Sequence, residues 1–233
     1  MVPRKILASL ILALNLACAA DERAPAERNR AIATDTTSRE SSAPVIAFLG
    51  TSLTLGLGLP DHEAFPALIQ DTLDALELDF RVINAGESGG TSAGGLRRID
   101  WLLQQPISIL VLELGANDGL RGLDVETMRS NLQTIIDRTK KAHADAAIVI
   151  LGMEAPPNLG RQYTAAFHRV FPEIAQANGA TLVPFLLDSV GGIAELNQAD
   201  EIHPTAEGHR IMARTVWRVL EGVVRELDEE KAR

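Results

Sequence analysis

Short, continuously apolar runs alternate along this chain with segments of helical periodicity, and this alternation restricts the possible folds more than any other feature. A run that is apolar at nearly every position has no face suited to water, so it indicates a strand buried on both sides of a parallel sheet. Parallel neighbours need a crossover between them, usually a helix. The expected strands are Val45–Leu49, Arg81–Asn84, Ile107–Leu114, Ala147–Gly152 and Thr181–Phe185.

Several segments between these runs carry apolar residues three or four positions apart, which places those residues on one face of a helix. The inward-facing sets are Phe65, Leu68, Ile69, Leu73 and Leu76; Met128, Leu132, Ile135, Ile136 and Thr139; and, in a last helix from about Pro204, Ile211, Thr215, Val216, Val219, Leu220 and Val223. Five βα units predict an α/β fold, a three-layer α/β/α sandwich around a five-stranded parallel sheet. At 233 residues the chain suffices for one such domain, expected over 45–228, and is short for two.

Residues 1–19 have the features of a secretory leader: a basic start, an apolar run and small residues around Cys18. The apolar run is shorter than the roughly 20 residues that a bilayer requires. Two processing routes fit this segment. Lipoprotein processing would acylate Cys18 and tether the protein to a membrane, whereas ordinary signal cleavage would release it. Both routes predict an exported protein, either periplasmic or anchored to the membrane.

Residues 20–44 contain almost no large apolar side chain, so we expect a disordered tether between the leader and the domain. The formal net charge of the chain is −9, and the sequence contains no cluster of basic residues. This balance argues against nucleic acid as a partner. Cys18 is the only cysteine, so the chain forms no intramolecular disulfide.

Polar segments directly follow the first three expected strands and supply Ser52, Gly86 and Asn117. The carboxyl ends of parallel strands form the ligand-binding edge of an open sheet, so these residues are expected to converge. Ser52 can act as a nucleophile, although a serine here is also a common helix N-cap. The amides of Ser52 and Gly86 and the Asn117 side chain are suited to stabilising an oxyanion. Gly86 and Asn117 also fit ordinary turns.

A fourth segment, Asp200 to Pro204, supplies an imidazole and a carboxylate. Pro204 biases His203 away from helical geometry, and Asp200 can bind one ring nitrogen and fix the tautomer. The other histidines, His62, His143, His168 and His209, are expected on the surface or in packing. Ser52, His203 and Asp200 together predict acyl transfer through a serine nucleophile. No cluster has metal-ligand spacing and no dinucleotide loop is present, so we expect neither a metal nor an organic cofactor.

The four ordered segments resemble the blocks of the SGNH or GDSL-type hydrolases, most closely their bacterial lysophospholipase, thioesterase and arylesterase branch. The matching residues are Ser52, Gly86, Asn117 and His203, with Asp200 in the expected place, and the run from Gly115 to Gly122 is particularly similar to that branch. The resemblance covers about Val45 to Leu220. It implies the flavodoxin-like fold of this family and a serine esterase that works without a metal.

The resemblance also implies where the acyl chain binds. The loop with Pro156, Pro157 and Asn158 resembles the acyl-contacting loop of the family, and we expect it to line a shallow apolar groove together with Leu120. Two prolines are equally typical of an ordinary loop. The expected substrates are small esters with short to medium acyl chains, aryl esters or lysophospholipids. Two alternatives stay open: a carbohydrate deacetylase, which would need stacking aromatics although only Trp101, Trp217 and Tyr163 are available, and an envelope protein that binds acylated ligands without hydrolysis.

The chain departs from the family pattern at two positions. Thr51 stands where the first block usually has Asp, and Gly90 stands where the second block often has Asp. We hypothesise that the two acids belong to one hydrogen-bond set and are lost together, and that Glu87 restores negative charge nearby. Neither position is a proposed catalytic group, so activity is expected to survive.

Overall fold

The computed structural model describes residues 43–231 and 233, so the predicted leader, Cys18 and the tether up to residue 42 lie outside the described residues. Five strands form one sheet in the order β2-β1-β3-β4-β5, and every neighbouring pair is parallel. They are β1 (Val45–Gly50), β2 (Arg81–Gly86), β3 (Ile107–Leu112), β4 (Ala147–Leu151) and β5 (Thr181–Val183). The predicted fold is therefore confirmed. β5 ends before the predicted Phe185 because Pro184 has no N–H to donate to a ladder.

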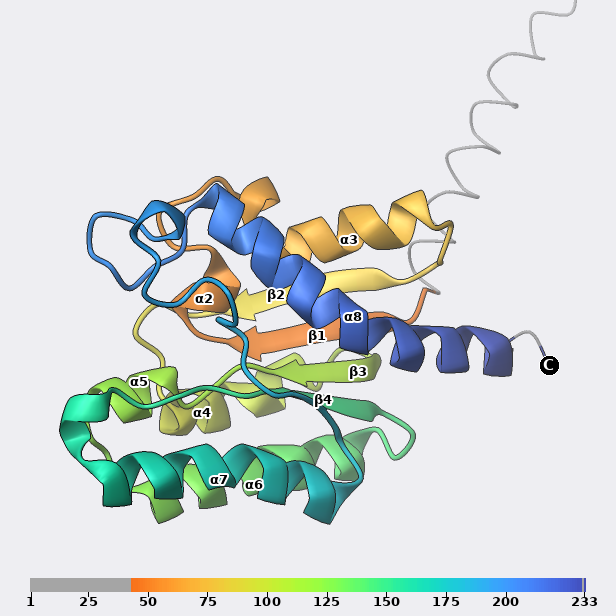
Figure 1. The fold of residues 1–233 in the computed structure, drawn as a ribbon. Helices are drawn as coiled ribbons and strands as arrows, with labels where there is room; N and C mark the ends of the chain where they lie inside the picture. Colours follow the sequence, from red (N-terminus) through yellow and green to blue (C-terminus); the bar gives the residue numbers. More distant parts are fainter. Residues whose placement is uncertain (1–42, 232) are drawn as a thin grey trace, which may run out of the picture. The chain divides into compact units, whose positions relative to one another are not determined.

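The described part of the chain also contains seven α-helices and three short 3₁₀ helices, of which η3 and α8 follow the last strand. Figure 1 shows α3 and α8 on one face of the sheet and α4, α6 and α7 on the other. The helices are α2 (Ser52–Leu55), α3 (Phe65–Ala75), α4 (Ser92–Leu102), α5 (Ala116–Leu120), α6 (Val125–Ala142), α7 (Arg161–Asn178) and α8 (Ala206–Lys231), with η1 (Asp61–Glu63), η2 (Pro157–Leu159) and η3 (Ala194–Leu196). α8 begins two residues after Pro204 and continues beyond residue 228.

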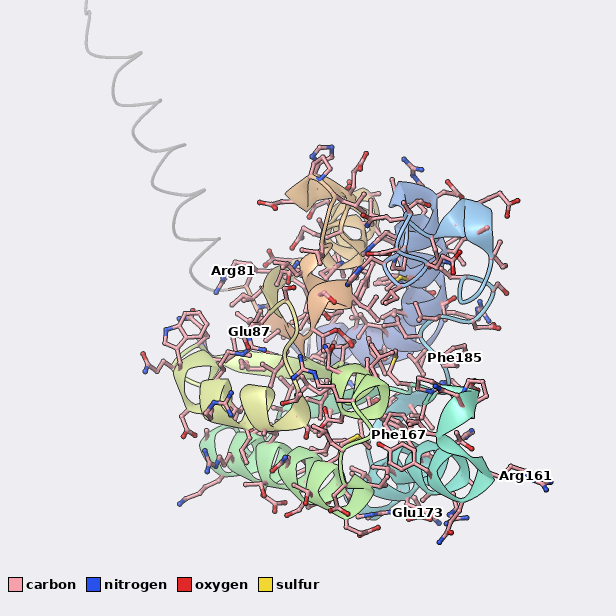
Figure 2. All side chains as sticks on the ribbon, turned by 90° about the vertical axis from the view of Figure 1, so that its left-hand side faces the viewer. Arg81, Glu87, Arg161, Phe167, Glu173 and Phe185 are labelled. Carbon is pink, nitrogen blue, oxygen red and sulfur yellow. The ribbon has the colours of Figure 1, made fainter. Side chains whose placement is uncertain are left out.

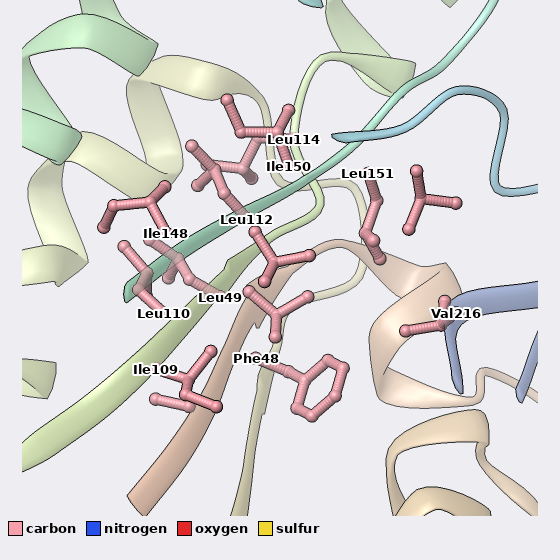
Figure 3. Packing of buried hydrophobic residues seen from close by; sticks show 14 of the residues in the cluster. Phe48, Leu49, Ile109, Leu110, Leu112, Leu114, Ile148, Ile150, Leu151 and Val216 are labelled. Carbon is pink, nitrogen blue, oxygen red and sulfur yellow. The ribbon is translucent and has the colours of Figure 1, made fainter. Parts of the chain in front are cut away.

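The hydrophobic core lies on both faces of the central strands. All six residues of β1 are buried, and Phe48 and Leu49 pack among residues from β3, β4 and α8 (Figure 3). The predicted inward faces of α3, α6 and α8 do contact this core, with one exception. Leu76 is 44% exposed, because it is the C-cap of α3, where the chain turns away.

The sheet has its switch point between β1 and β3. From β1 the chain crosses to β2 on the α3 face, and from β2 it returns past β1 to β3 on the α4 face. The loops that leave β1 and β3 therefore diverge, which opens a crevice at the carboxyl ends of these neighbouring strands. α2 and α5 follow these two strand ends, and Ser52 of α2 and Asn117 of α5 line the same cavity. Among the described helices, none is long and apolar enough to cross a bilayer.

Candidate active site

Ser52 is the first residue of α2, directly after the central strand β1. Thr51 is the N-cap, and its hydroxyl accepts a hydrogen bond from the Leu53 amide at 3.3 Å. α2 ends after one turn at Gly56, which adopts a left-handed conformation. This tight turn fixes the backbone of Ser52, which lines a cavity at the strand ends.

His203 brings its imidazole to Ser52 from a distant loop. His203 Nε2 lies 2.9 Å from Ser52 Oγ, and His203 Nδ1 lies 2.6 Å from Asp200 Oδ2. The second Asp200 oxygen accepts hydrogen bonds from the Ile202 and His203 amides, both at 3.0 Å. The two ends of this loop are joined by a hydrogen bond from the Gln198 backbone amide to the His203 carbonyl, at 2.7 Å. Three residues expected to act together thus form one continuous chain of contacts.

These contacts also set the electrostatics of Asp200. The hydrogen bond to the His203 ring, followed by those from the His203 and Ile202 amides, lowers the pKa of Asp200 well below its usual range. Each donor stabilises the charged form of the carboxylate. Asp200 is therefore ionised at neutral pH, with its charge directed at the Nδ1 side of the imidazole. This arrangement presents Nε2 to Ser52 as the proton acceptor.

Asn117 reaches the same cavity from α5, which follows β3. Its side-chain Nδ2 donates to the Gly90 carbonyl at 2.9 Å, so one of its two N–H bonds is fixed and the amide plane is oriented. The next residue, Asp118, is buried and accepts hydrogen bonds from the Ser92 amide and hydroxyl. These contacts tie the Asn117 turn to the loop after β2.

Gly86 does not reach the cavity. Its amide donates to the side-chain oxygen Oδ1 of Asn84, two residues earlier, at 3.0 Å, and an added Cβ would lie 2.9 Å from the Thr51 carbonyl oxygen. Gly86 is therefore a close-packing glycine beside α2, and this corrects its expected place in the oxyanion hole. Gly89, three residues further on, lines the cavity and has a φ of +71°.

The cavity has a volume of about 580 Å³, within the range of small-molecule sites. Leu120, Pro156 and Pro157 line it as expected, whereas Asn158 is exposed in η2 and does not line it. Met153, Glu154, Ala155, Glu201 and Ile202, which lie in the same predicted segments, also line the cavity. The sequence interpretation missed Leu187, Gly191, Gly192 and Asn197, because they belong to a part of the chain that carries none of the predicted site residues.

Thr51 and Gly90, the two departures from the family pattern, have different immediate neighbours, and the hypothesis that the two acids belong to one hydrogen-bond set stays a prediction. Thr51 contacts Glu113, with Oγ1 3.0 Å from Oε2. Gly90 instead lies beside Glu87: a Cβ at Gly90 would be 3.3 Å from Glu87 Oε2. Glu87 also forms an ion pair with Arg98, Nε to Oε2 3.0 Å. Glu87 does place negative charge next to position 90, as expected.

The remaining histidines lie outside the site. His209 is buried in α8, where its Nδ1 accepts a hydrogen bond from the Phe65 backbone amide at 3.1 Å. Burial, and to a smaller extent the charge of His203, lowers the pKa of His209 to about 4. His143 Nε2 contacts the Leu103 carbonyl, and His62 and His168 are exposed. Across the described residues, no group of three or more histidine, cysteine or acidic side chains is arranged to hold a metal ion.

Figure 2 looks onto the face that was on the left of Figure 1, where the strands end. Arg161, at the start of α7, points out to solvent, whereas Phe167 on the same helix turns inward. Phe167 packs against Gly119 of α5: a Cβ at Gly119 would lie 3.1 Å from its ring. The Phe167 ring thus supports α5 and, through α5, the Asn117 turn.

Comparison with known proteins gives consistent results. Residues 48–211 match the family described as GDSL-like Lipase/Acylhydrolase. The chain is 39% identical over 184 residues to an esterase, TesA, of Pseudomonas aeruginosa, covering 78% of this chain and 90% of that protein. It is 34% identical over 190 residues to a protein of Escherichia coli K12 named thioesterase 1/protease 1/lysophospholipase L1, covering 81% and 88%.

Solved structures are similar over the same region. The crystal structure of the psychrotrophic esterase EstA from Pseudoalteromonas sp., inhibited by monoethylphosphonate, has a TM-score of 0.73 and 34% identity. That match covers 78% of this chain and 98% of the other. A crystal structure of a TesA has the same TM-score, with 37% identity over 76% of this chain and 98% of that one.

Proposed function

The chain belongs to the GDSL-like lipase/acylhydrolase family and is a serine esterase, and we propose that Ser52 is its nucleophile, His203 its general base and Asp200 the group that orients the base. The observation that carries this assignment is the continuous contact from Ser52 Oγ through the His203 ring to Asp200 Oδ2, at 2.9 and 2.6 Å. A hydroxyl nucleophile needs an adjacent base, and the base needs a fixed tautomer.

The reaction follows from this geometry. His203 Nε2 takes the Ser52 proton while Ser52 Oγ attacks the ester carbonyl, and Asp200 stabilises the imidazolium. The imidazolium then gives its proton to the leaving alcohol oxygen as the C–O bond breaks, which leaves an acyl group on Ser52. Water, deprotonated by His203, attacks this ester, and the proton returns to Ser52 as the acid departs.

Three donors are available for the oxyanion of each tetrahedral intermediate. The Ser52 amide lies at the first position of α2 and has no acceptor within the helix. The Asn117 side chain has a second N–H besides the one held by Gly90. We assign the third donor to the amide of Gly89 in place of Gly86, because Gly89 lines the cavity and the Gly86 amide is occupied by Asn84.

The walls of the cavity support small esters as substrates. Leu120, Met153, Pro156 and Ile202 offer apolar contacts for an acyl or aryl group. The only charged residues among the lining residues, apart from the catalytic imidazole, are Glu154 and Glu201, so the walls carry no cation for a polyanionic leaving group. We therefore propose short to medium-chain and aryl esters as the preferred substrates, ahead of anionic acyl carriers.

The aromatic residues weaken the deacetylase alternative. Stacking platforms for sugar rings are usually aromatic, yet Trp101, Trp217 and Tyr163 do not line the cavity. Trp101 is 67% exposed, and Tyr163 donates its hydroxyl to the Leu123 carbonyl instead. The alternative of a protein that binds acylated ligands without hydrolysis predicts ester binding without turnover.

The test is hydrolysis of p-nitrophenyl esters from two to sixteen carbons by the full-length protein and its Ser52→Ala variant. We expect turnover of the short esters, loss of at least about 10³-fold in the variant, and a decline at long chains that measures the cavity. A fluorophosphonate should label the native protein once, at Ser52. Equal activity of both proteins would exclude Ser52 as nucleophile, and ester binding without turnover would favour the binding-protein alternative.

We further propose that the protein is exported and tethered through a lipidated Cys18. Only the sequence of residues 1–19 supports this proposal. Expression with radiolabelled palmitate, compared with a Cys18→Ser variant, tests it. Label that is lost in the variant supports the lipoprotein, whereas an unlabelled protein cleaved near Ala19 would indicate free release.

A further inference from the structure

Glu113 is a fully buried carboxyl group next to the nucleophile that the proposed reaction does not use. It directly follows β3, and its amide donates to the Leu49 carbonyl of β1, which keeps it in the central layer of the sheet. Burying a carboxyl group without partners is costly, so its contacts must compensate for the lost water. Burial raises the pKa of Glu113, while hydrogen bonds from Thr51 and Thr54 oppose this shift.

The partners of Glu113 are the two threonines that flank the Ser52 turn. Glu113 Oε2 accepts hydrogen bonds from the Thr51 amide at 2.8 Å and from the Thr54 amide at 3.3 Å. The same oxygen accepts the Thr51 hydroxyl at 3.0 Å and the Thr54 hydroxyl at 2.8 Å. Both threonines are completely buried. One side chain thus holds the backbone on both sides of Ser52.

The neighbouring glycine has a backbone fitted to this arrangement. A Cβ at Gly50 would lie 2.7 Å from Glu113 Oε2 and would clash with Thr54 Oγ1. The Glu113 carboxyl group and the Thr54 hydroxyl fill the space that a side chain at position 50 would need, so only glycine fits there. The contacts between Glu113 and the turn are accordingly part of a close-packed unit.

We propose that Glu113 is a positioning residue for the nucleophile: by holding Thr51 and Thr54 it sets the place of Ser52 Oγ relative to His203 Nε2. This inference rests on the proposed role of Ser52. At position 51 a threonine donates to Glu113 through its hydroxyl, whereas an Asp would bring a second carboxyl group into contact with it. Like charges in contact at low dielectric repel each other strongly.

The first variant is Glu113→Gln, which keeps the shape of the side chain. The amide presents either an NH₂ group or a weaker acceptor to the four donors, which are the amides and hydroxyls of Thr51 and Thr54. We expect kcat on p-nitrophenyl butyrate to fall about 10- to 100-fold, with KM changed less than about twofold, because a displaced nucleophile affects the reaction more than binding. The rate of fluorophosphonate labelling of Ser52 should fall in parallel. Assays are run well below the melting temperature of each variant.

A matched control separates positioning from general stability. Leu220→Ala removes a buried side chain from α8 without touching the turn, so it should lower the melting temperature and keep kcat. If Glu113→Gln also keeps kcat, or if Leu220→Ala loses kcat to the same extent, Glu113 has only a structural role. If Ser52→Ala stays active, the proposed nucleophile and this inference both fail, whereas an inactive Ser52→Ala beside a normal Glu113→Gln overturns this inference alone.

Two further sets keep the test decisive if Glu113→Gln does not fold. Thr54→Val removes one hydroxyl donor and should lower kcat several-fold, whereas Thr54→Ser should retain it. Thr51→Asp should lower kcat and stability, and the double variant Thr51→Asp/Glu113→Gln should recover part of both, since the amide of Gln then donates to the new carboxylate. Absence of any recovery, together with normal kcat in Thr54→Val, would contradict the proposal.

Discussion

The Asn117 side chain is held by the Gly90 carbonyl, with Nδ2 and the carbonyl oxygen 2.9 Å apart, so two loops that follow different strands share one hydrogen bond. The contact uses one N–H of the amide and orients the other. The hydrogen bonds that Asp118 accepts from Ser92 join the same two loops, so the Asn117 contact is one of several that link them beyond the strand ends. The hydrogen bond therefore preorganises a donor before any substrate arrives.

Replacing Asn117 with Ala should lower kcat by about 10² to 10³, which is the usual effect of removing one oxyanion donor. KM should change little, since the donor acts mainly on charge that develops in the transition state. Steady-state kinetics on p-nitrophenyl butyrate measure both constants. A variant that raises KM at constant kcat would show that Asn117 binds the ground state instead.

Replacing Asp200 with Asn should lower kcat by about 10² to 10⁴, because the imidazolium loses its counter-charge and the ring its fixed tautomer. The low pKa of Asp200 gives a second expectation: Asp200 stays ionised as pH falls through the usual range of aspartate, so its protonation does not limit native activity there. The measurement is the pH dependence of kcat/KM of the native protein. A loss of activity on protonation of a group with the ordinary pKa of an aspartate would contradict this expectation.

The two glycines after β2 should respond differently to alanine. Gly86→Ala has no room for a Cβ, which would lie 2.7 Å from the Leu55 Cα, so the melting temperature should fall sharply. Gly89→Ala meets only Arg121 Nη2 at 3.5 Å, and its cost is backbone strain at positive φ, about 1 to 2 kcal/mol. Its kcat should nevertheless fall, because Gly89 lines the cavity and its amide is the proposed third oxyanion donor. Thermal unfolding and steady-state kinetics of both variants test these expectations. A Gly89→Ala variant that is folded and fully active would show that another group supplies the third oxyanion donor.

The same loop shows where sequence reasoning reaches its limit. The serine, the asparagine and the histidine could be located because each directly follows a strand or precedes a proline. The choice between Gly86 and Gly89 depends on Asn84, which occupies one amide, and on α2, which packs against one Cα. These are three-dimensional contacts that composition and spacing do not encode.

Secondary structure followed a similar rule. All five strands were predicted, and for β1, β3 and β4 the signal is a continuous apolar run, because these strands are buried on both faces. The edge strands β2 and β5 are only partly buried. α4 and α7 were not delimited from the sequence. α4 contains Gly94 and Gly95, with Gly95 allowing Leu114 to approach, and α7 continues through Pro172. Packing against the sheet overrides the low helix propensity of these residues.

His209 should make stability depend on pH. Its pKa is about 4 in the folded protein against 6.5 ordinarily, so in this interval the unfolded chain binds more protons. The stability that a neutral His209 contributes is thus present above about pH 6.5 and is lost as pH falls towards 4, by roughly 3 kcal/mol in total. Urea unfolding of native protein and His209→Gln at pH 7 and pH 5 measures this. The variant should be less stable at pH 7, because the ring packs on Phe65, but should lose less between the two pH values. Equal losses in both proteins would mean that other groups carry the dependence.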